Sequence, residues 1–229
     1  MSRIGISETG LFHKRDGLVN EDHIMTGSTD RYRVIVLADG VSTCRCSGIG
    51  ARIACEKTKD YLLGNAEDVF SYEEVTIAEY VLGLVNRAIC ETAESDGNDI
   101  CDYSSTLSAV LYDSETCKAI VFHLGDGLIL LVNDNGCKVI GMPYDHSVGT
   151  PVTTTEGACK MSIVRKIDTS DSSYILMFSD GAWDLIYTNG SLMKEVMNFI
   201  INGEFDKLND YIRNRVPEDD YSYIGMSLR

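Results

Sequence analysis

The sequence has 229 residues, of which 44% are hydrophobic, and it carries a net charge of −15 with an isoelectric point near 4.6. A chain of this length can bury one large core or two small ones. We expect one domain over residues 1–229, because there are only three prolines and no Ser/Gly/Pro-rich linker. The charge argues against a nucleic-acid partner, since no cluster of basic residues is denser than Lys14-Arg15.

The N-terminus lacks the apolar stretch of a signal peptide, and no segment approaches the ~20 apolar residues of a membrane span. We therefore expect a soluble, cytoplasmic protein with no membrane partner. The eight cysteines contain no Cys-x-x-Cys pair, which predicts reduced and mostly buried thiols. The four histidines are not spaced for joint ligation, so a structural zinc site is not expected.

The first half of the chain predicts three strands and then two helices. The segment 32–38 contains the apolar run Val34–Leu37 and ends at Asp39, as a buried strand would. Apolar residues recur at helical spacing in two later segments, which could cover one face of a sheet. The expected strands are residues 3–8, 23–28 and 32–38, and the expected helices are residues 47–63 and 74–93.

The second half predicts a meander of strands, a pair of helices and a last strand. Asp113-Ser114 and Asp134-Asn135-Gly136 are typical turn sequences, so antiparallel hairpins are expected. This order of elements indicates an α+β fold of two packed antiparallel β-sheets flanked by helix pairs, an αββα sandwich. The expected strands are residues 106–112, 118–124, 128–133, 137–140, 160–167, 174–178 and 222–228, and the expected helices are residues 191–201 and 205–213.

Five short acidic motifs occur along the chain, and most of them follow or precede an apolar run. A carboxylate at the end of a buried strand is held rigidly and still reaches solvent, which suits the oxygen ligation of Mg²⁺ or Mn²⁺. Each aspartate could also be an ordinary turn or cap residue. The motifs are Asn20-Glu21-Asp22, Asp39-Gly40, Gly125-Asp126-Gly127, Ser179-Asp180-Gly181 and Asp219-Asp220.

Together with four further segments, these motifs resemble the metal-dependent serine/threonine phosphatases of the protein phosphatase 2C type, and a divergent member of bacterial type in particular. The matches span nearly the whole chain. A single Asp-Gly dipeptide carries little information, whereas the ordered set is specific. The further segments are Ser105-Thr106, Asp145-His146-Ser147, Ala182-Trp183-Asp184 and Tyr221-Ser222.

The resemblance implies a centre of two Mn²⁺ or Mg²⁺ ions, with Asp39 bridging both and the Gly40 carbonyl joining through one of them. Asp180 and Asp219 would complete the shell of the first ion, although a shift of one residue would exchange Asp219 for Asp220. Glu21, with Asp22 as a further candidate, would act through waters on the ions. A third ion can lie near the carboxylates that correspond to Asp126 and Asp184.

The implied catalytic residues are Asp39, Asp180, Asp219 and Glu21. Two metal ions about 3.5–4 Å apart lower the pKa of a shared water and neutralise phosphoryl oxygens, so that the activated water attacks phosphorus without a protein nucleophile. The expected substrate is a phosphoserine or phosphothreonine residue of a protein in a signalling pathway. A cognate Ser/Thr kinase is the expected second partner.

The sequence departs from the family pattern at two places. The family often has a histidine after its Asp-Gly motif, whereas this chain continues from Gly40 to Cys46 without one, which leaves metal-bound water or His146 to protonate the leaving group. A phosphate-binding arginine normally precedes the Asn-Glu-Asp motif. Lys14, Arg15 and Arg45 are the candidates to replace it.

Two other functions fit parts of the sequence. A catalytically inactive module of the same fold would bind phosphoproteins as a regulator, and the missing histidine and arginine motivate it. A cysteine-dependent phosphatase would use Cys46 as the nucleophile and Arg52 as the phosphate clamp, since their spacing matches that motif. The residues on either side of that motif do not fit this class of enzyme, and no acid loop is recognisable.

Overall fold

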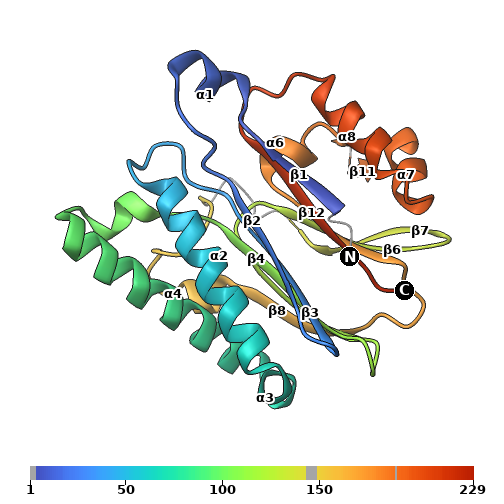
Figure 1. Ribbon diagram of the computed structural model, residues 1–229, viewed down its shortest axis with the longest axis horizontal. Helices are drawn as coiled ribbons and strands as arrows, with labels where there is room; N and C mark the ends of the chain where they lie inside the picture. The colour runs from blue at the N-terminus through green and yellow to red at the C-terminus, as the bar shows by residue number, and fades with distance from the viewer. Residues whose placement is uncertain (1–3, 143–148, 189) are drawn as a thin grey trace.

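The computed structural model describes residues 4–142, 149–188 and 190–229, which form two five-stranded antiparallel sheets packed face to face (Figure 1). The first sheet has the strand order β1-β12-β9-β6-β7 and the second has the order β2-β3-β4-β5-β8. The strands of the first sheet are β1 (Ile4–Glu8), β12 (Tyr221–Ser227), β9 (Tyr174–Phe178), β6 (Leu128–Asn133) and β7 (Gly136–Gly141). The strands of the second are β2 (His23–Ser28), β3 (Tyr32–Ala38), β4 (Leu107–Asp113), β5 (Lys118–Leu124) and β8 (Ile163–Asp168).

Helices cover the outer face of each sheet. Figure 1 shows α2 and α4 over the second sheet, and α7 and α8 over the first. The long helices are α2 (Ser47–Gly64), α4 (Glu74–Asp96), α7 (Lys194–Ile201) and α8 (Phe205–Arg213). The short elements are α1 (Leu11–Asp16), α3 (Ala66–Ser71), the 3₁₀ helix η1 (Ile100–Tyr103), α5 (Ala158–Met161), α6 (Asp180–Trp183) and the hairpin of β10 (Tyr187–Thr188) and β11 (Ser191–Leu192).

Three apolar layers hold this sandwich together, and β3 contributes to two of them. Val34, Val36 and Ala38 pack against the helices α2 and α4. Ile35 and Leu37 point to the opposite face and pack between the two sheets. Because successive side chains of a strand alternate between its faces, a strand covered on both sides reads as a continuous apolar run. The third layer lies between the first sheet and the helices α7 and α8.

The predicted α+β sandwich of two antiparallel sheets flanked by helix pairs is confirmed, and most strand boundaries agree with the structure within one residue. The segment 160–167 was predicted as one strand, but residues 158–161 form α5 and β8 begins at Ile163. The helix predicted over residues 191–201 begins at Lys194, because Ser191–Leu192 pairs with Tyr187–Thr188 in a hairpin. The short helices α1 and α3 were not predicted.

The prediction for the cysteines is half right. All eight are free thiols, but only Cys55 is buried, and Cys90 and Cys101 are exposed. The "mostly buried" part is wrong, because several cysteines lie at helix surfaces and in connecting segments. Within the described part of the chain, no helix has both the length and the hydropathy that a bilayer crossing requires.

Candidate metal centre

Antiparallel pairing brings the acidic motifs to one end of both sheets. The pair His23 and Ala38 places Glu21-Asp22 beside Asp39, just beyond the ends of β2 and β3. In the other sheet, Phe178 pairs with both Leu128 and Tyr223. The segments that carry Asp126, Asp180 and Asp219 therefore emerge together. Strands that are far apart in sequence thus bring their acidic motifs to the same edge of the sandwich.

The centre of this edge is a cluster of three aspartates. Asp39, Asp126 and Asp180 each offer a carboxylate oxygen, and these atoms all lie within 4.8 Å of one another. They line a cavity of about 330 Å³. Its other lining residues are Gly40, Val41, Ser42, Cys44, Ser104, Thr106, Thr150, Val152 and Asp219.

Close backbone packing explains two of the glycines in this region. A Cβ atom on Gly181 would lie 2.2 Å from the carbonyl oxygen of Asp220, and one on Gly10 would lie 2.1 Å from that of Asp219. Both glycines therefore allow the segment before β12 to approach the cluster. The Asp180-Gly181 dipeptide is therefore not an isolated turn. It begins α6, and its glycine leaves room for the backbone of Asp220.

The electrostatics of the cluster favour a cation. Burial raises the pKa of Asp39 well above its usual value, and the charges of Asp22 and Asp180 add to the effect. Burial also raises the pKa of Asp22 to about 7 and raises that of Asp180. Like charges gathered in a poorly hydrated site destabilise one another, and a bound cation would reverse this effect.

Two carboxylate oxygens at this edge are buried without a hydrogen-bond partner among the described residues. They are Oδ1 of Asp22 and Oε2 of Glu21. The other oxygen of Asp22, Oδ2, accepts a hydrogen bond of 3.0 Å from the Ser179 hydroxyl. Buried acceptors of this kind are costly unless a ligand, ion or water satisfies them. Together with the carboxylate oxygens of the three clustered aspartates, these two oxygens fit the ligand preference of Mg²⁺ or Mn²⁺.

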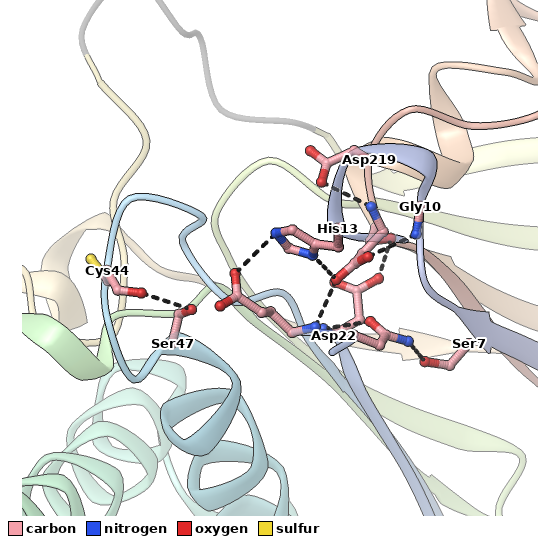
Figure 2. Close-up of polar contacts among 11 residues, drawn as sticks. Ser7, Gly10, His13, Asp22, Cys44, Ser47 and Asp219 are labelled. Carbon is pink, nitrogen blue, oxygen red and sulfur yellow. Dashed lines mark hydrogen bonds and ion pairs between the residues drawn. The ribbon is translucent and has the colours of Figure 1, made fainter. Parts of the chain in front are cut away.

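Asp219 and Asp220 have different surroundings. Asp219 lines the cavity, and its carboxylate accepts the Asp220 amide at 2.8 Å. Asp220 is only 4% exposed and belongs to a hydrogen-bond network with Gly10 and His13, which Figure 2 labels. Its carboxylate accepts hydrogen bonds from the Gly10 amide at 2.8 Å, the Glu21 amide at 2.7 Å and His13 Nδ1 at 2.8 Å. The structure therefore gives Asp220 a role in tying segments together.

His13 was not anticipated from the sequence. It is 4% exposed, and its Nε2 atom lies 3.7 Å from Oε2 of Glu21 (Figure 2). Burial opposes protonation of the imidazole, but the hydrogen bond to Asp220 and the nearby carboxylates outweigh it and raise the pKa of His13. Burial raises the pKa of Glu21 as well. His13 thus links Asp220 to Glu21, and no sequence signal pointed to it.

A scan of the sequence against family models gives one family over most of the chain. The model described as protein phosphatase 2C matches residues 9–211. The chain belongs to the protein phosphatase 2C family. Its members include serine/threonine phosphatases, which are hydrolases, and the resemblance in the motifs is confirmed. A search of curated protein sequences finds no match.

Solved structures of phosphatases share this fold. Stp1 from Staphylococcus aureus is 14% identical with a TM-score of 0.73, and the alignment covers 100% of this chain and 95% of that one. PstP/Ppp from Mycobacterium tuberculosis is 14% identical with a TM-score of 0.68, covering 98% and 97%. RsbX in complex with magnesium is 14% identical with a TM-score of 0.55, covering 97% and 92%. At these identities the likeness shows a shared protein phosphatase 2C fold.

The other predicted site residues lie around the cluster. Gly40 lines the cavity and pairs with Ser105 in an isolated bridge. Asp184 is exposed and lies one helical turn after Asp180, outside the group of three carboxylates, so its ligation stays a prediction. Lys14, Arg15 and Arg45 are exposed, and none of them lines the described cavity. His146 lies outside the described residues.

Thr150 is a second residue that the sequence did not single out. Its hydroxyl donates a hydrogen bond of 3.1 Å to Oδ2 of Asp126. The segment that carries it is fixed to the second sheet, because the Thr153 amide donates to the Ser105 carbonyl at 2.8 Å. Thr150 therefore orients one of the three clustered carboxylates.

The cysteine-based alternative has poor geometry. The Cys46 amide donates to the Asp102 carbonyl at 2.9 Å and is not available to a phosphate. The Cys46 sulfur accepts a hydrogen bond of 3.5 Å from the side-chain amide of Asn98. Arg52 is half exposed and pairs with Glu56 at 3.1 Å along the surface of α2. In these contacts Cys46 and Arg52 serve the fold and do not form a phosphate-binding loop.

Proposed function

We propose that this chain is a Mn²⁺- or Mg²⁺-dependent phosphatase that hydrolyses phosphoserine and phosphothreonine in proteins. The observation that carries the proposal is the group of Asp39, Asp126 and Asp180, whose oxygens lie within 4.8 Å of one another in a cavity at the loop edge of both sheets. A donor set made only of oxygen atoms suits these hard divalent ions. Membership of the protein phosphatase 2C family supports the same reaction.

The proposed ligands follow from position. The charges of both Asp22 and Asp180 act on Asp39, so we infer that Asp39 would be shared by two ions, with the Gly40 carbonyl beside it. Asp180 and Asp219 would complete one shell, and the exposure of Asp219 to the cavity favours it over the buried Asp220. Glu21 and Asp22 would act from the outer side through the two buried oxygens that accept no hydrogen bond from the described residues. Asp126 would hold a further ion, with Asp184 as its predicted neighbour.

When bound, the divalent ions would neutralise phosphoryl oxygens and lower the pKa of an attacking water. Among the described residues that line the cavity, none is Lys, Arg or His. The protein's own lining therefore offers no positive charge to the phosphoryl group, so the acidic cluster would act by holding the ions. Ser42, Ser104 and Thr106 add hydroxyl groups that can orient a phosphate ester.

Hydrolysis of a phosphothreonine peptide tests the proposal. The rate would be measured with Mn²⁺, with Mg²⁺ and with excess EDTA, and then for Asp39→Asn, Asp180→Asn and Cys46→Ser. We expect EDTA to abolish the activity. The rate should fall at least 100-fold in both aspartate variants, as expected when a group that stabilises the transition state is removed. Cys46→Ser should keep full activity.

Two results would contradict it. EDTA-resistant activity that disappears in Cys46→Ser would show a thiolate mechanism. Tight phosphopeptide binding without turnover, in protein that binds Mn²⁺, would show a non-catalytic phosphoprotein-binding module. A cytoplasmic location and a cognate kinase remain predictions of the sequence.

A further inference from the structure

Four exposed apolar side chains share one corner of the molecule. We call this surface, formed by Phe12, Lys14, Arg15, Leu18, Val19 and Val216, the α1 corner. Phe12 is 60% exposed, Leu18 53%, Val19 77% and Val216 54%. Backbone hydrogen bonds join its two segments, from Leu11 to Pro217 at 3.0 Å and from Phe12 to Glu218 at 2.9 Å. Figure 1 shows α1 projecting beyond the sheets.

The fold holds these apolar side chains at the surface. The helix α1 is fixed by the buried His13, which turns Phe12 outward. Val216 has a φ of 53°, a left-handed conformation that is unfavourable for a β-branched residue. Single exposed apolar residues are common, whereas a group of them on one surface indicates an interaction site. A strained, exposed valine within the group strengthens that interpretation.

The α1 corner adjoins the candidate metal centre through the chain itself. Val19 precedes Glu21 by two residues and Val216 precedes Asp219 by three. Because consecutive Cα atoms are about 3.8 Å apart, these separations are at most about 8 and 11 Å. An extended peptide advances about 3.3 Å per residue. A side chain two to four residues from a bound phosphoresidue would therefore reach the α1 corner.

The α1 corner carries two adjacent basic side chains. Lys14 and Arg15 are exposed, and no ion pair within the described parts of the chain engages either of them. Asp16 and Glu218 are exposed nearby, so the surface is mixed in charge. On a chain of net charge −15, two adjacent basic groups beside the centre still favour an acidic ligand locally.

We propose that the α1 corner is the docking surface for the phosphoprotein substrate. It binds an apolar side chain two to four residues from the phosphoresidue, while Lys14 and Arg15 attract an acidic side chain beside it. This inference rests on the proposed phosphatase function. It names the substrate class: phosphopeptides in which apolar and acidic residues flank the phosphoserine or phosphothreonine.

The test compares two kinds of substrate. One is p-nitrophenyl phosphate, which has no peptide, and the other is a phosphothreonine peptide with Leu and Glu at the flanking positions or Ser at both. The variant is Phe12→Ser combined with Val19→Ser, and its matched control is Val75→Ser, which removes a valine 57% exposed on α4. Thermal melting would establish that the wild type and every variant are folded.

We expect the double variant to raise KM for the Leu/Glu peptide about tenfold, as loss of two partly buried apolar contacts predicts, with kcat unchanged. Hydrolysis of p-nitrophenyl phosphate and the control variant should match the wild type. Arg15→Glu should abolish the preference for Glu over Ser in the peptide. An unchanged KM, or an equal loss on both substrates, would overturn the proposal.

Failure of the docking inference is distinguishable from failure of the phosphatase function. If the wild type hydrolyses neither substrate, the phosphatase proposal fails. The docking inference is then decided by fluorescence anisotropy of the same labelled phosphopeptides. Tighter binding of the Leu/Glu peptide that the double variant weakens about tenfold would support the docking surface, and equal binding by both proteins would refute it.

Discussion

His13 Nδ1 lies 2.8 Å from Oδ2 of Asp220, and both side chains are only 4% exposed. The contact joins α1 to the segment before β12, across a sequence separation of 207 residues. On its other side His13 faces Glu21. One buried imidazole therefore couples the N-terminal part of the chain, the candidate metal centre and the last strand.

Replacing His13 should affect both stability and metal affinity. We expect His13→Ala to lower the free energy of unfolding by about 1–3 kcal/mol, because a buried carboxylate loses one partner. Loss of the group that fixes Glu21 should weaken Mn²⁺ binding about 10- to 100-fold. His13→Gln keeps a hydrogen-bond donor and should recover part of the stability and part of the Mn²⁺ affinity. Urea unfolding and calorimetric Mn²⁺ titration measure these effects, with the exposed Asp30→Asn as control. A stability loss with unchanged Mn²⁺ affinity would reduce His13 to a structural role.

The two adjacent aspartates before β12 should respond differently to the same substitution. Asp219→Asn changes an exposed residue, so stability should stay within about 0.5 kcal/mol of wild type, while activation by Mn²⁺ falls sharply. Asp220→Asn disturbs hydrogen bonds to Gly10, Glu21 and His13, and should cost about 1–3 kcal/mol of stability. Thermal unfolding and Mn²⁺-dependent hydrolysis separate the two. The reverse pattern would make Asp220 the ligand.

The ion pair of Arg31 and Asp113 predicts a pH dependence of stability. The Asp113 carboxylate is nearly buried and receives Arg31 at 2.7 and 2.8 Å. The hydrogen bonds to Arg31 hold its pKa well below the usual range. A lowered pKa in the folded state gives stability that is complete above the unfolded value of about 3.9 and is lost as the pH falls further.

We therefore expect Asp113→Asn to lower the free energy of unfolding by about 1–3 kcal/mol at pH 7, allowing for the partial exposure of Arg31. The difference from wild type should shrink as the pH falls from about 4 toward 2. Urea unfolding at several pH values measures it. Phosphatase activity at pH 7 should be unchanged, since Asp113 lies at the end of β4 away from Thr106. A difference that stays constant with pH would show that the charge is not the cause.

The sequence predicted those parts of the fold that leave a local pattern. The run Val34–Leu37 indicated a buried strand, and β3 is buried on both of its faces. The helix α1 has six residues, fewer than two turns, and gives no detectable periodicity. Its end depends on Gly17, whose φ is 70°, and on a hydrogen bond from Leu18 to His13.

For the candidate site, motif order found the carboxylates but not their partners. Asp39, Asp126 and Asp180 were predicted as ligands, and the structure brings them together. His13 and Thr150 could not be found, because their contacts with Asp220 and Asp126 depend on how distant segments cross at the edge of the sandwich. The choice between Asp219 and Asp220 also depends on which carboxylate turns inward, which sequence adjacency does not encode.

Calorimetric titration of Mn²⁺ into metal-free protein tests the central claim most directly. For the wild type we predict at least two bound ions per chain and a rise in the thermal midpoint, since an ion that binds only the folded state stabilises it. Asp39→Asn should lose this binding and the rise, while Asp30→Asn keeps both. Equal stoichiometry and affinity in the wild type and Asp39→Asn would contradict a metal centre built on Asp39.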